Sequence, residues 1–397
     1  MSTLSPEERE AFLKLPASIP PPGEVSNLVD PPNLVVAGYV VVLMALCWTC
    51  LFFAIRVYTK VFVIRSLRMS DYAMAIGWGL FMGYFAPAWL VIHVAPGIDQ
   101  WNMSFGDLRS MLWYYHVGSI LAGLIILFIK ISILLQFLEI FSQSRDFFFW
   151  SCHAVIWMNI VYYTINTFLD IFGCDPINKA WDFLITEGTC VVQTDVQNLS
   201  ASVINCASDL VILVLPQTKI WRLQMSRRKK LAVSMAFLVG VMACTAAIVK
   251  LAYSVLIYKT TNNASYFAFL MALSSLAEIS CGIIAGCLPC TPRFVRRIAA
   301  LPSVERWTTS IRSLLSASSR HGGHDSASTR HDGGIELNDH FGHKNGHAKG
   351  LGRGCDDLYP LTQTESLGAE GEGRDDASVT ANARLSATMR VEGRVSI

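Results

Sequence analysis

Seven long apolar runs lie between residues 33 and 289 of this 397-residue chain, and they constrain its fold more than any other feature. A helix that spans a bilayer needs roughly 20 mostly apolar residues, whereas a helix on the surface of a soluble protein is apolar on one face. Most of these runs are apolar all round, so we predict an all-α membrane protein, a seven-transmembrane helix bundle that contacts the lipid bilayer. The runs cover about 33–55, 72–95, 111–138, 147–173, 197–218, 231–258 and 266–288.

Basic residues are unevenly distributed among the predicted connections. Four Lys or Arg residues lie within 56–68, whereas the alternate connections mix Arg109, Lys179 and Lys259 with acidic residues. Cytoplasmic loops carry the excess of Lys and Arg, so we place the N-terminus outside and the C-terminus in the cytoplasm. The connection after the fifth run could present a basic surface to a cytoplasmic signalling partner, through Arg222, Arg227, Arg228, Lys229 and Lys230.

The segments outside the spans differ from the bundle in composition. Ser5 followed by Pro6 and acidic residues is typical of a helix start, and prolines follow it. Basic residues alternate with apolar ones after Thr291, which favours an amphipathic helix on the inner leaflet. The end of the chain is rich in Gly, Ser and His and predicts disorder. We divide the chain into an extracellular Pro-rich segment (1–32), the seven-helix domain (33–290), an amphipathic juxtamembrane segment (291–315) and a disordered cytoplasmic tail (316–397).

The predicted outer loops carry residues that are typical of an oxidising compartment. Cys174 and Cys190 both lie in the loop after the fourth span, where a disulfide would stiffen a lid over the outer mouth. Asn102, Asn198 and Asn263 each begin an N-x-S sequon on or next to the same face, so we predict N-glycosylation at these positions.

Ionisable side chains within a membrane are costly and suggest a functional site. Lys130, Asp209 and Glu278 lie about eight to ten residues from the inner ends of their helices, and therefore at one depth. We predict that they form an intramembrane ionic cluster, with Asn205 on the same helical face as Asp209. Such a cluster could fix helix packing, act as a conformational switch or relay ions.

A second polar layer is expected nearer the outside. It consists of His93, His116, Tyr163, Asp170 and Lys250, and several Trp and Tyr residues lie at the same level. An interfacial aromatic belt would explain it. The alternative is an outward-opening pocket for a small, partly apolar ligand, covered by the loop between the two cysteines.

Short motifs along the spans resemble the fungal rhodopsin-domain integral membrane proteins, which include the satratoxin-cluster and GPCR-like seven-helix members. The resemblance covers about residues 35–295 and implies a multi-pass protein of the plasma membrane or an endomembrane with a sensing or accessory role. The motifs are Arg56-x-Tyr58, Ser70-Asp71-Tyr72, Lys130-Ile131-Ser132, Cys174-Asp175-Pro176, Asp209-x-x-Ile212, Ile220-Trp221, Glu278-Ile279 and Cys287-Leu288-Pro289.

Three functions are compatible with these features. We first expect a GPCR-like sensor of a small molecule; the alternative is an accessory membrane protein or transporter of fungal secondary-metabolite biosynthesis, and an enzyme is the least favoured. The seventh span, 266–288, contains no lysine, so we expect no retinal. We also expect no other cofactor, no metal and no nucleic-acid partner.

Overall fold

The structure is a computed structural model that describes residues 5–141, 146–220, 227–259 and 263–299, and side chains within 218–233 are not part of that description. The described residues all belong to one compact unit. The predicted tail, 316–397, lies outside the described residues, as does the juxtamembrane segment beyond Ala299. Both of these remain predictions.

Seven helices among the described residues are long and apolar enough to cross a bilayer, which confirms the predicted fold class. Two short strands form a hairpin after the fourth of these helices. The elements are α1 (Pro6–Leu13), α2 (Val35–Tyr58), α3 (Met69–Val94), α4 (Phe105–Phe141), α5 (Phe147–Phe172), β1 (Cys174–Asp175), β2 (Thr189–Cys190), α6 (Thr194–Ile220), α7 (Arg227–Lys259), α8 (Ala264–Cys287) and α9 (Thr291–Ala299).

Local chemistry explains where several helices begin and end. The Glu8 backbone N–H donates to Ser5 Oγ, and the Ser5 N–H donates to Glu8 Oε2, so α1 begins with a capping box. The Asp71 carboxylate accepts from the Arg68 backbone N–H at 3.0 Å and caps the start of α3. A π-helical segment, Thr59–Ile64, extends α2 until Arg65 adopts a left-handed conformation with φ 55° and stops it.

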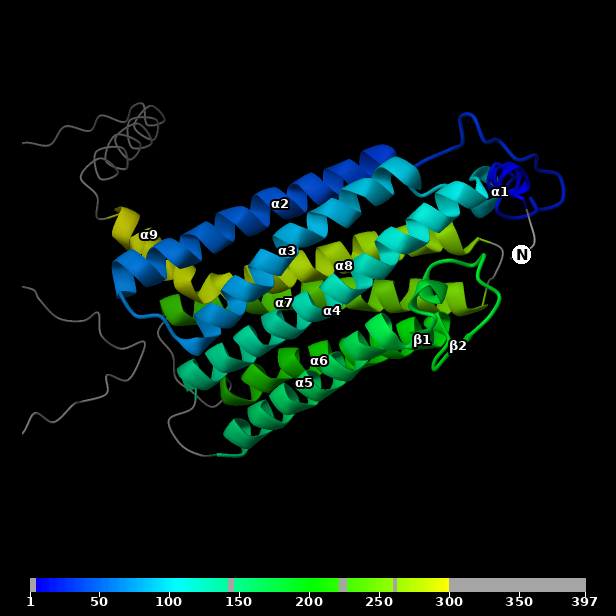
Figure 1. Cartoon of the computed structure of the whole chain (residues 1–397). Helices are drawn as coiled ribbons and strands as arrows, with labels where there is room; N and C mark the ends of the chain where they lie inside the picture. Colours follow the sequence, from blue (N-terminus) through cyan, green and yellow to red (C-terminus); the bar gives the residue numbers. More distant parts are fainter. Residues whose placement is uncertain (1–4, 142–145, 221–226, 260–262, 300–397) are drawn as a thin grey trace, which may run out of the picture. The chain divides into compact units, whose positions relative to one another are not determined.

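The spanning helices follow one another around the bundle, and α4 also reaches α8 across its interior (Figure 1). The core between them is built from large apolar side chains that are almost fully buried, including Met74, Phe81, Ile125, Ile279 and Ile283. Lipid offers backbone groups no hydrogen bonds, so the long helices satisfy their own.

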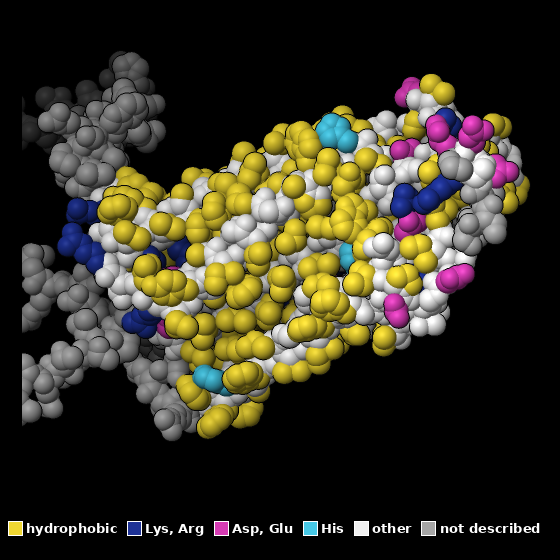
Figure 2. Space-filling model, viewed as in Figure 1, with side chains coloured by type: hydrophobic (Ala, Val, Ile, Leu, Met, Phe, Trp, Pro, Cys, Tyr) yellow, Lys and Arg dark blue, Asp and Glu magenta, His cyan; other side chains and the backbone are white. Residues whose placement is uncertain are grey.

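Charged side chains gather at the two ends of the bundle. In Figure 2, hydrophobic side chains cover its length, Lys and Arg lie at both ends, and most Asp and Glu lie at the end opposite α9. The N-terminal segment and the β hairpin lie at this second end (Figure 1). This distribution agrees with the predicted orientation, and we refer to the two ends as inner and outer.

The N-terminal segment is folded against the outer end of α4. The Ala17 N–H donates to Met103 O at 2.9 Å, and the Phe105 N–H donates to Leu15 O at 3.0 Å. The rings of Phe12 and Phe105 stack at 4.6 Å. The short helix before Pro16 is present as predicted, and the residues after it form part of the outer surface of the bundle.

Candidate functional site

Lys130, on α4, lies at the centre of a buried charged group. Its Nζ is 2.8 Å from Asp209 Oδ1 on α6, and the two side chains are only 5% and 13% exposed. The same ammonium donates to Asn205 Oδ1 at 2.8 Å and to Ser208 Oγ. A buried lysine is tolerated when it is paired and hydrogen-bonded in this way.

Asn205 connects this ion pair to a second one. Its Oδ1 also accepts from Tyr163 OH at 2.6 Å, and its Nδ2 donates to Glu278 Oε1 at 2.6 Å. The other oxygen of Glu278 lies 3.4 Å from Lys250 Nζ. The resulting group has two lysines and two carboxylates and no net formal charge. We call it the pocket-floor cluster: Lys130, Asn205, Asp209, Lys250 and Glu278.

The position of Lys250 differs from the sequence prediction, which placed it in the outer layer and left it out of the ionic cluster. Side chains of an α-helix lean toward its N-terminus. Helix α7 begins at the inner end and α8 at the outer end (Figure 1). Lys250 therefore leans inward and Glu278 leans outward, so the two meet.

A pocket lies directly outward of this cluster. Helices α2 to α8 all contribute to its wall, and Asn205 and Lys250 belong to both the wall and the cluster. Its volume is about 130 Å³, comparable with an apolar cavity of about 150 Å³ that binds benzene. One side is polar, with Tyr163, Asn166, Asp170, Asn198 and Ser202, and the other is apolar, with Val42, Val91, Ile92, Phe269 and Leu276.

The predicted outer layer is divided between the pocket and its surroundings. Tyr163, Asp170 and Lys250 line the pocket, whereas His93 and His116 do not belong to its wall. His93 Nε2 lies 3.2 Å from Tyr39 OH in an exposed contact. The His116 ring lies 5.0 Å from the Trp181 ring of the outer loop. The two histidines are therefore packing partners of aromatic residues in this structure.

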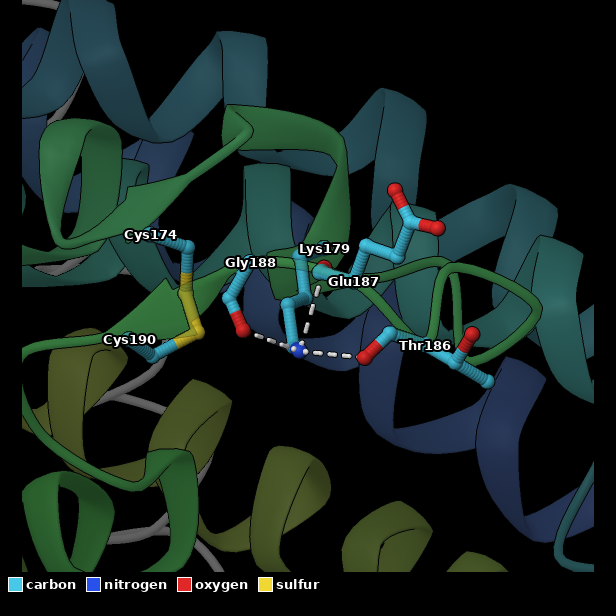
Figure 3. Close-up of a disulfide and its surroundings, with 6 residues drawn as sticks. All are labelled: Cys174, Lys179, Thr186, Glu187, Gly188 and Cys190. Atoms are coloured by element: carbon cyan, nitrogen blue, oxygen red, sulfur yellow. Dashed lines mark hydrogen bonds between the residues drawn. A yellow bond between two sulfur atoms is a disulfide. The ribbon is translucent and has the colours of Figure 1, made fainter.

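The outer loop between α5 and α6 is braced internally (Figure 3). Cys174 and Cys190 are joined by a disulfide, as predicted. Lys179 Nζ donates to the backbone carbonyls of Thr186, Glu187 and Gly188 at 3.3, 3.2 and 2.8 Å. Gly188 has φ 90°, and a Cβ there would lie 2.0 Å from Asp175 O, so the hairpin requires glycine.

Further side-chain contacts fasten this loop to the outer end of α4. Arg109 Nη2 lies 2.6 Å from Asp182 Oδ2, and Asp182 is buried. The Trp181 ring lies 4.5 Å from that of Trp113, in an edge-to-face arrangement. The loop is thus held against the rim of the bundle near the pocket-lining residue Tyr114.

Two of the three sequon asparagines form side-chain hydrogen bonds in the structure, and the third lines the pocket. Asn102 is buried, and its Oδ1 accepts from the Asn27 N–H at 2.9 Å. Asn263 Nδ2 donates to Asp99 Oδ1 at 2.6 Å. Asn198 lies within α6 and lines the pocket. Glycosylation at any of them stays a prediction, and at Asn102 it requires the buried side chain to become exposed.

A second buried ionic group lies at the inner end, and sequence reasoning missed it. Arg56 Nη2 and Lys60 Nζ lie 2.7 and 2.9 Å from the two oxygens of Asp71. Arg56 Nη1 also donates to Gly286 O at 2.5 Å. We call Arg56, Lys60 and Asp71 the inner clamp. Arg56 and Asp71 both belong to the motifs of the first subsection. Arg56 and Lys60, however, lie in a basic connection between predicted spans, and this position suggested that their side chains are exposed.

The basic surface predicted for a cytoplasmic partner consists of residues whose side chains the structure does not describe. Arg222 is not among the described residues, and the side chains of Arg227, Arg228, Lys229 and Lys230 are not described either. Within the described part of the chain, no group of three or more His, Cys, Asp or Glu side chains is arranged to hold a metal ion.

The comparisons identify the family. The model of the fungal rhodopsin domain matches residues 55–297, which is more than half of the chain. The chain belongs to the fungal rhodopsin-domain family. It is therefore an integral multi-pass membrane protein, as its seven apolar helices also show. In this fungal rhodopsin-domain protein, α8 contains no lysine, and the lysines of the pocket-floor cluster lie on α4 and α7.

Three curated relatives are similar to this fungal rhodopsin-domain protein. Fugralins biosynthesis cluster protein 2 of Gibberella zeae is 29% identical over 300 residues, 73% of each chain. A SAT4 family membrane protein of Emericella nidulans is 37% identical over 201 residues, 50% of each chain. The polyenoic acids biosynthesis gene cluster protein Ba17b of Metarhizium anisopliae is 32% identical over 71 residues, 18% of this chain and 19% of the relative. No solved structure matches the chain.

Proposed function

We propose that this protein is a non-enzymatic accessory membrane protein of a fungal secondary-metabolite pathway, and that it binds a small, largely apolar pathway molecule in the pocket between its helices. The observation that carries this proposal is the pocket itself. Seven helices line it, one side is largely apolar, and the charged groups of its wall lie on the other side and at the floor. This division is what a pocket for an oxygenated apolar molecule requires.

The relatives support the pathway assignment. Two of them are named as products of biosynthesis clusters, one for fugralins and one for polyenoic acids. We propose the same kind of setting for this chain, without transferring either product to it.

Binding is favoured over catalysis by the state of the two carboxylates at the floor. Asp209 is paired with Lys130, and Glu278 accepts from Asn205 and is paired with Lys250. A general acid needs a proton that it can deliver to a substrate. Carboxylates held as ion pairs by lysines are poorly placed for that role.

A sensing role is the second candidate, and one connection in the structure favours it. Glu278 of the pocket-floor cluster and Gly286, whose carbonyl accepts from Arg56 of the inner clamp, lie on the same helix, α8. A ligand that moved Glu278 would therefore act on a rigid element that reaches the inner end. Ligand-dependent accessibility of the inner loops would distinguish a sensor from a protein that only binds or carries its ligand.

The proposal is tested in a fungal strain from which the gene has been deleted, by profiling small molecules in mycelium and medium. Deletion is expected to change the distribution of a group of related metabolites. Complementation with Gly123→Leu, which fills the pocket, should resemble the deletion. A Cβ at Gly123 has its nearest neighbours at 3.9 and 4.0 Å in Thr167 and Tyr163.

Gly83→Leu is the matched control, because a Cβ at that helical glycine meets nothing within 4 Å. It should restore the wild-type profile. If the Gly123→Leu protein is present in normal amounts and also restores the wild-type profile, the pocket is not the functional site and the proposal is wrong.

A further inference from the structure

Among the described residues of the pocket wall, Asp170 and Lys250 carry a formal charge, and they differ in their hydrogen-bond partners. Asp170 Oδ1 accepts from Gln197 Nε2 at 2.8 Å, and Asp170 Oδ2 accepts from Asn166 Nδ2 at 3.1 Å. Both oxygens of this carboxylate therefore already have a donor. Asn166 and Gln197 thus hold the Asp170 carboxylate on the polar side of the pocket wall.

Lys250 has fewer hydrogen-bond partners than it can use. An ammonium has three donors, and among the described residues Lys250 Nζ has one hydrogen-bond partner, Glu278 Oε2. Their separation of 3.4 Å exceeds the 2.8 Å of the Lys130–Asp209 pair. The Lys250 side chain is also 15% exposed, against 5% for Lys130. Lys250 thus offers donors to the pocket that the protein itself leaves open.

The cluster beneath Lys250 can accommodate a new acceptor there. Because an ammonium has three donors, Lys250 can donate to a ligand while it keeps its contact with Glu278. Glu278 also keeps its 2.6 Å hydrogen bond from Asn205 Nδ2, and Asn205 remains bound to Lys130. The ion pair between Lys250 and Glu278 therefore need not break when a ligand binds.

The dimensions of the pocket define the rest of the ligand. Its wall spans Asn198 to Asn205 on α6 and Phe269 to Leu276 on α8, about 10 Å of helical rise in each case. Lys250 lies at the floor, whereas Val91 and Ile92 lie near the outer end of α3. A polar head at the floor and an apolar body about two helical turns long would fill this space.

We infer that the pocket binds an amphiphilic carboxylic acid, with its carboxylate on Lys250 Nζ and its apolar body against Val91, Ile92 and Phe269. This inference rests on the proposed function and specifies the class of molecule that the pocket recognises. A carboxylate supplies acceptors to the open donors of the ammonium and forms a charge-assisted hydrogen bond.

The test uses the purified full-length protein in lipid nanodiscs, with 2-naphthoate, methyl 2-naphthoate and 2-naphthylmethylamine as probes of equal ring size. Isothermal titration should show that the acid binds at least about tenfold more tightly than the ester, equivalent to about 1.4 kcal/mol. The amine should bind more weakly than the ester, because its charge is like that of Lys250.

Variants assign the preference to Lys250. The double change Lys250→Met with Glu278→Gln removes both charges and avoids leaving a buried carboxylate unpaired; it should abolish the preference for the acid and retain binding of the ester. Lys250→Arg should keep the preference. Lys259→Met, at the exposed outer end of the same helix, should behave like the wild type.

The outcomes separate this inference from the proposed function. Equal affinity of the wild type for acid and ester, or an acid preference that survives in the double variant, overturns the carboxylate inference and leaves the pocket intact. Failure of the wild type to bind the acid overturns it as well. The proposed function is rejected separately, by a Gly123→Leu strain with a wild-type metabolite profile.

Discussion

The pocket-floor cluster and the inner clamp are both buried ionic groups on adjoining helices, but they differ in how completely they are satisfied. In the inner clamp each Asp71 oxygen has its own cation, and Arg56 also reaches a carbonyl of α8. In the pocket-floor cluster, Lys250 has one long hydrogen-bond contact among the described residues and lines a cavity. Burial of charge therefore does not by itself mark a binding site. The ligand site that we infer depends on an incompletely satisfied charge beside open space.

The strongest test of this distinction is Asp71→Asn in the inner clamp. It removes the charge of the carboxylate that Arg56 and Lys60 both contact, and breaking a buried ion pair on one side costs about 3–5 kcal/mol. We expect the free energy of unfolding, measured by denaturant titration in mixed micelles, to fall by about 4 kcal/mol. Naphthoate affinity of the folded protein should be unchanged.

Asp195→Asn, in the exposed first turn of α6, is the control for Asp71→Asn and should leave the free energy of unfolding nearly unaltered. A loss smaller than about 1 kcal/mol in the Asp71 variant would contradict a structural role for the inner clamp.

Lys130→Met applies the same test to the pocket-floor cluster. It removes the cation that holds Asp209 in the pocket-floor cluster, and we expect a loss of about 3 kcal/mol in the free energy of unfolding. Adding Asp209→Asn should recover part of that loss, because the second change removes the unpaired charge. The double-mutant cycle measures this coupling. Additive effects of the two changes would show that the 2.8 Å contact carries no interaction energy.

Arg109→Ala extends the comparison to a partly exposed pair and should have the smallest effect. The Arg109 side chain is 40% exposed, although its partner Asp182 is buried. Solvent screens such pairs, which contribute about 0.2–1 kcal/mol. We expect the free energy of unfolding to fall by less than about 1 kcal/mol. A loss above about 2 kcal/mol would mean that the outer loop depends on this one contact.

Much of the architecture could be predicted because each feature is local. The apolar runs, the capped helix at Ser5, the cysteine pair and the basic residues near the inner helix ends are all readable without knowing which helices touch. Depth along a helix is also readable, since the rise per residue is constant. That is why Lys130, Asp209 and Glu278 could be assigned to one level, and in the structure Lys130 contacts Asp209 directly and Glu278 through Asn205.

Contacts between helices could not be predicted from the sequence in the same way. Lys250 was assigned to the outer layer because its Cα position was considered without the inward lean of its side chain on α7. His93 and His116 have the right depth for the pocket, but they lie outside its wall. The inner clamp was missed because Arg56 and Lys60 were interpreted as exposed loop residues, whereas a π-helical extension of α2 buries Lys60.

The amino-acid sequence by itself determined that this protein crosses a membrane as a helical bundle, which end is basic, and at what depth its charges lie. These properties follow from the free-energy cost of placing unpaired backbone groups and charged side chains in hydrocarbon. Each spanning segment has to avoid that cost by itself. Only the tertiary structure decided that Glu278 pairs with Lys250, that Asn205 joins the two ion pairs, and that a pocket remains above them. Those outcomes depend on the rotation and packing of helices about one another, which no single segment specifies.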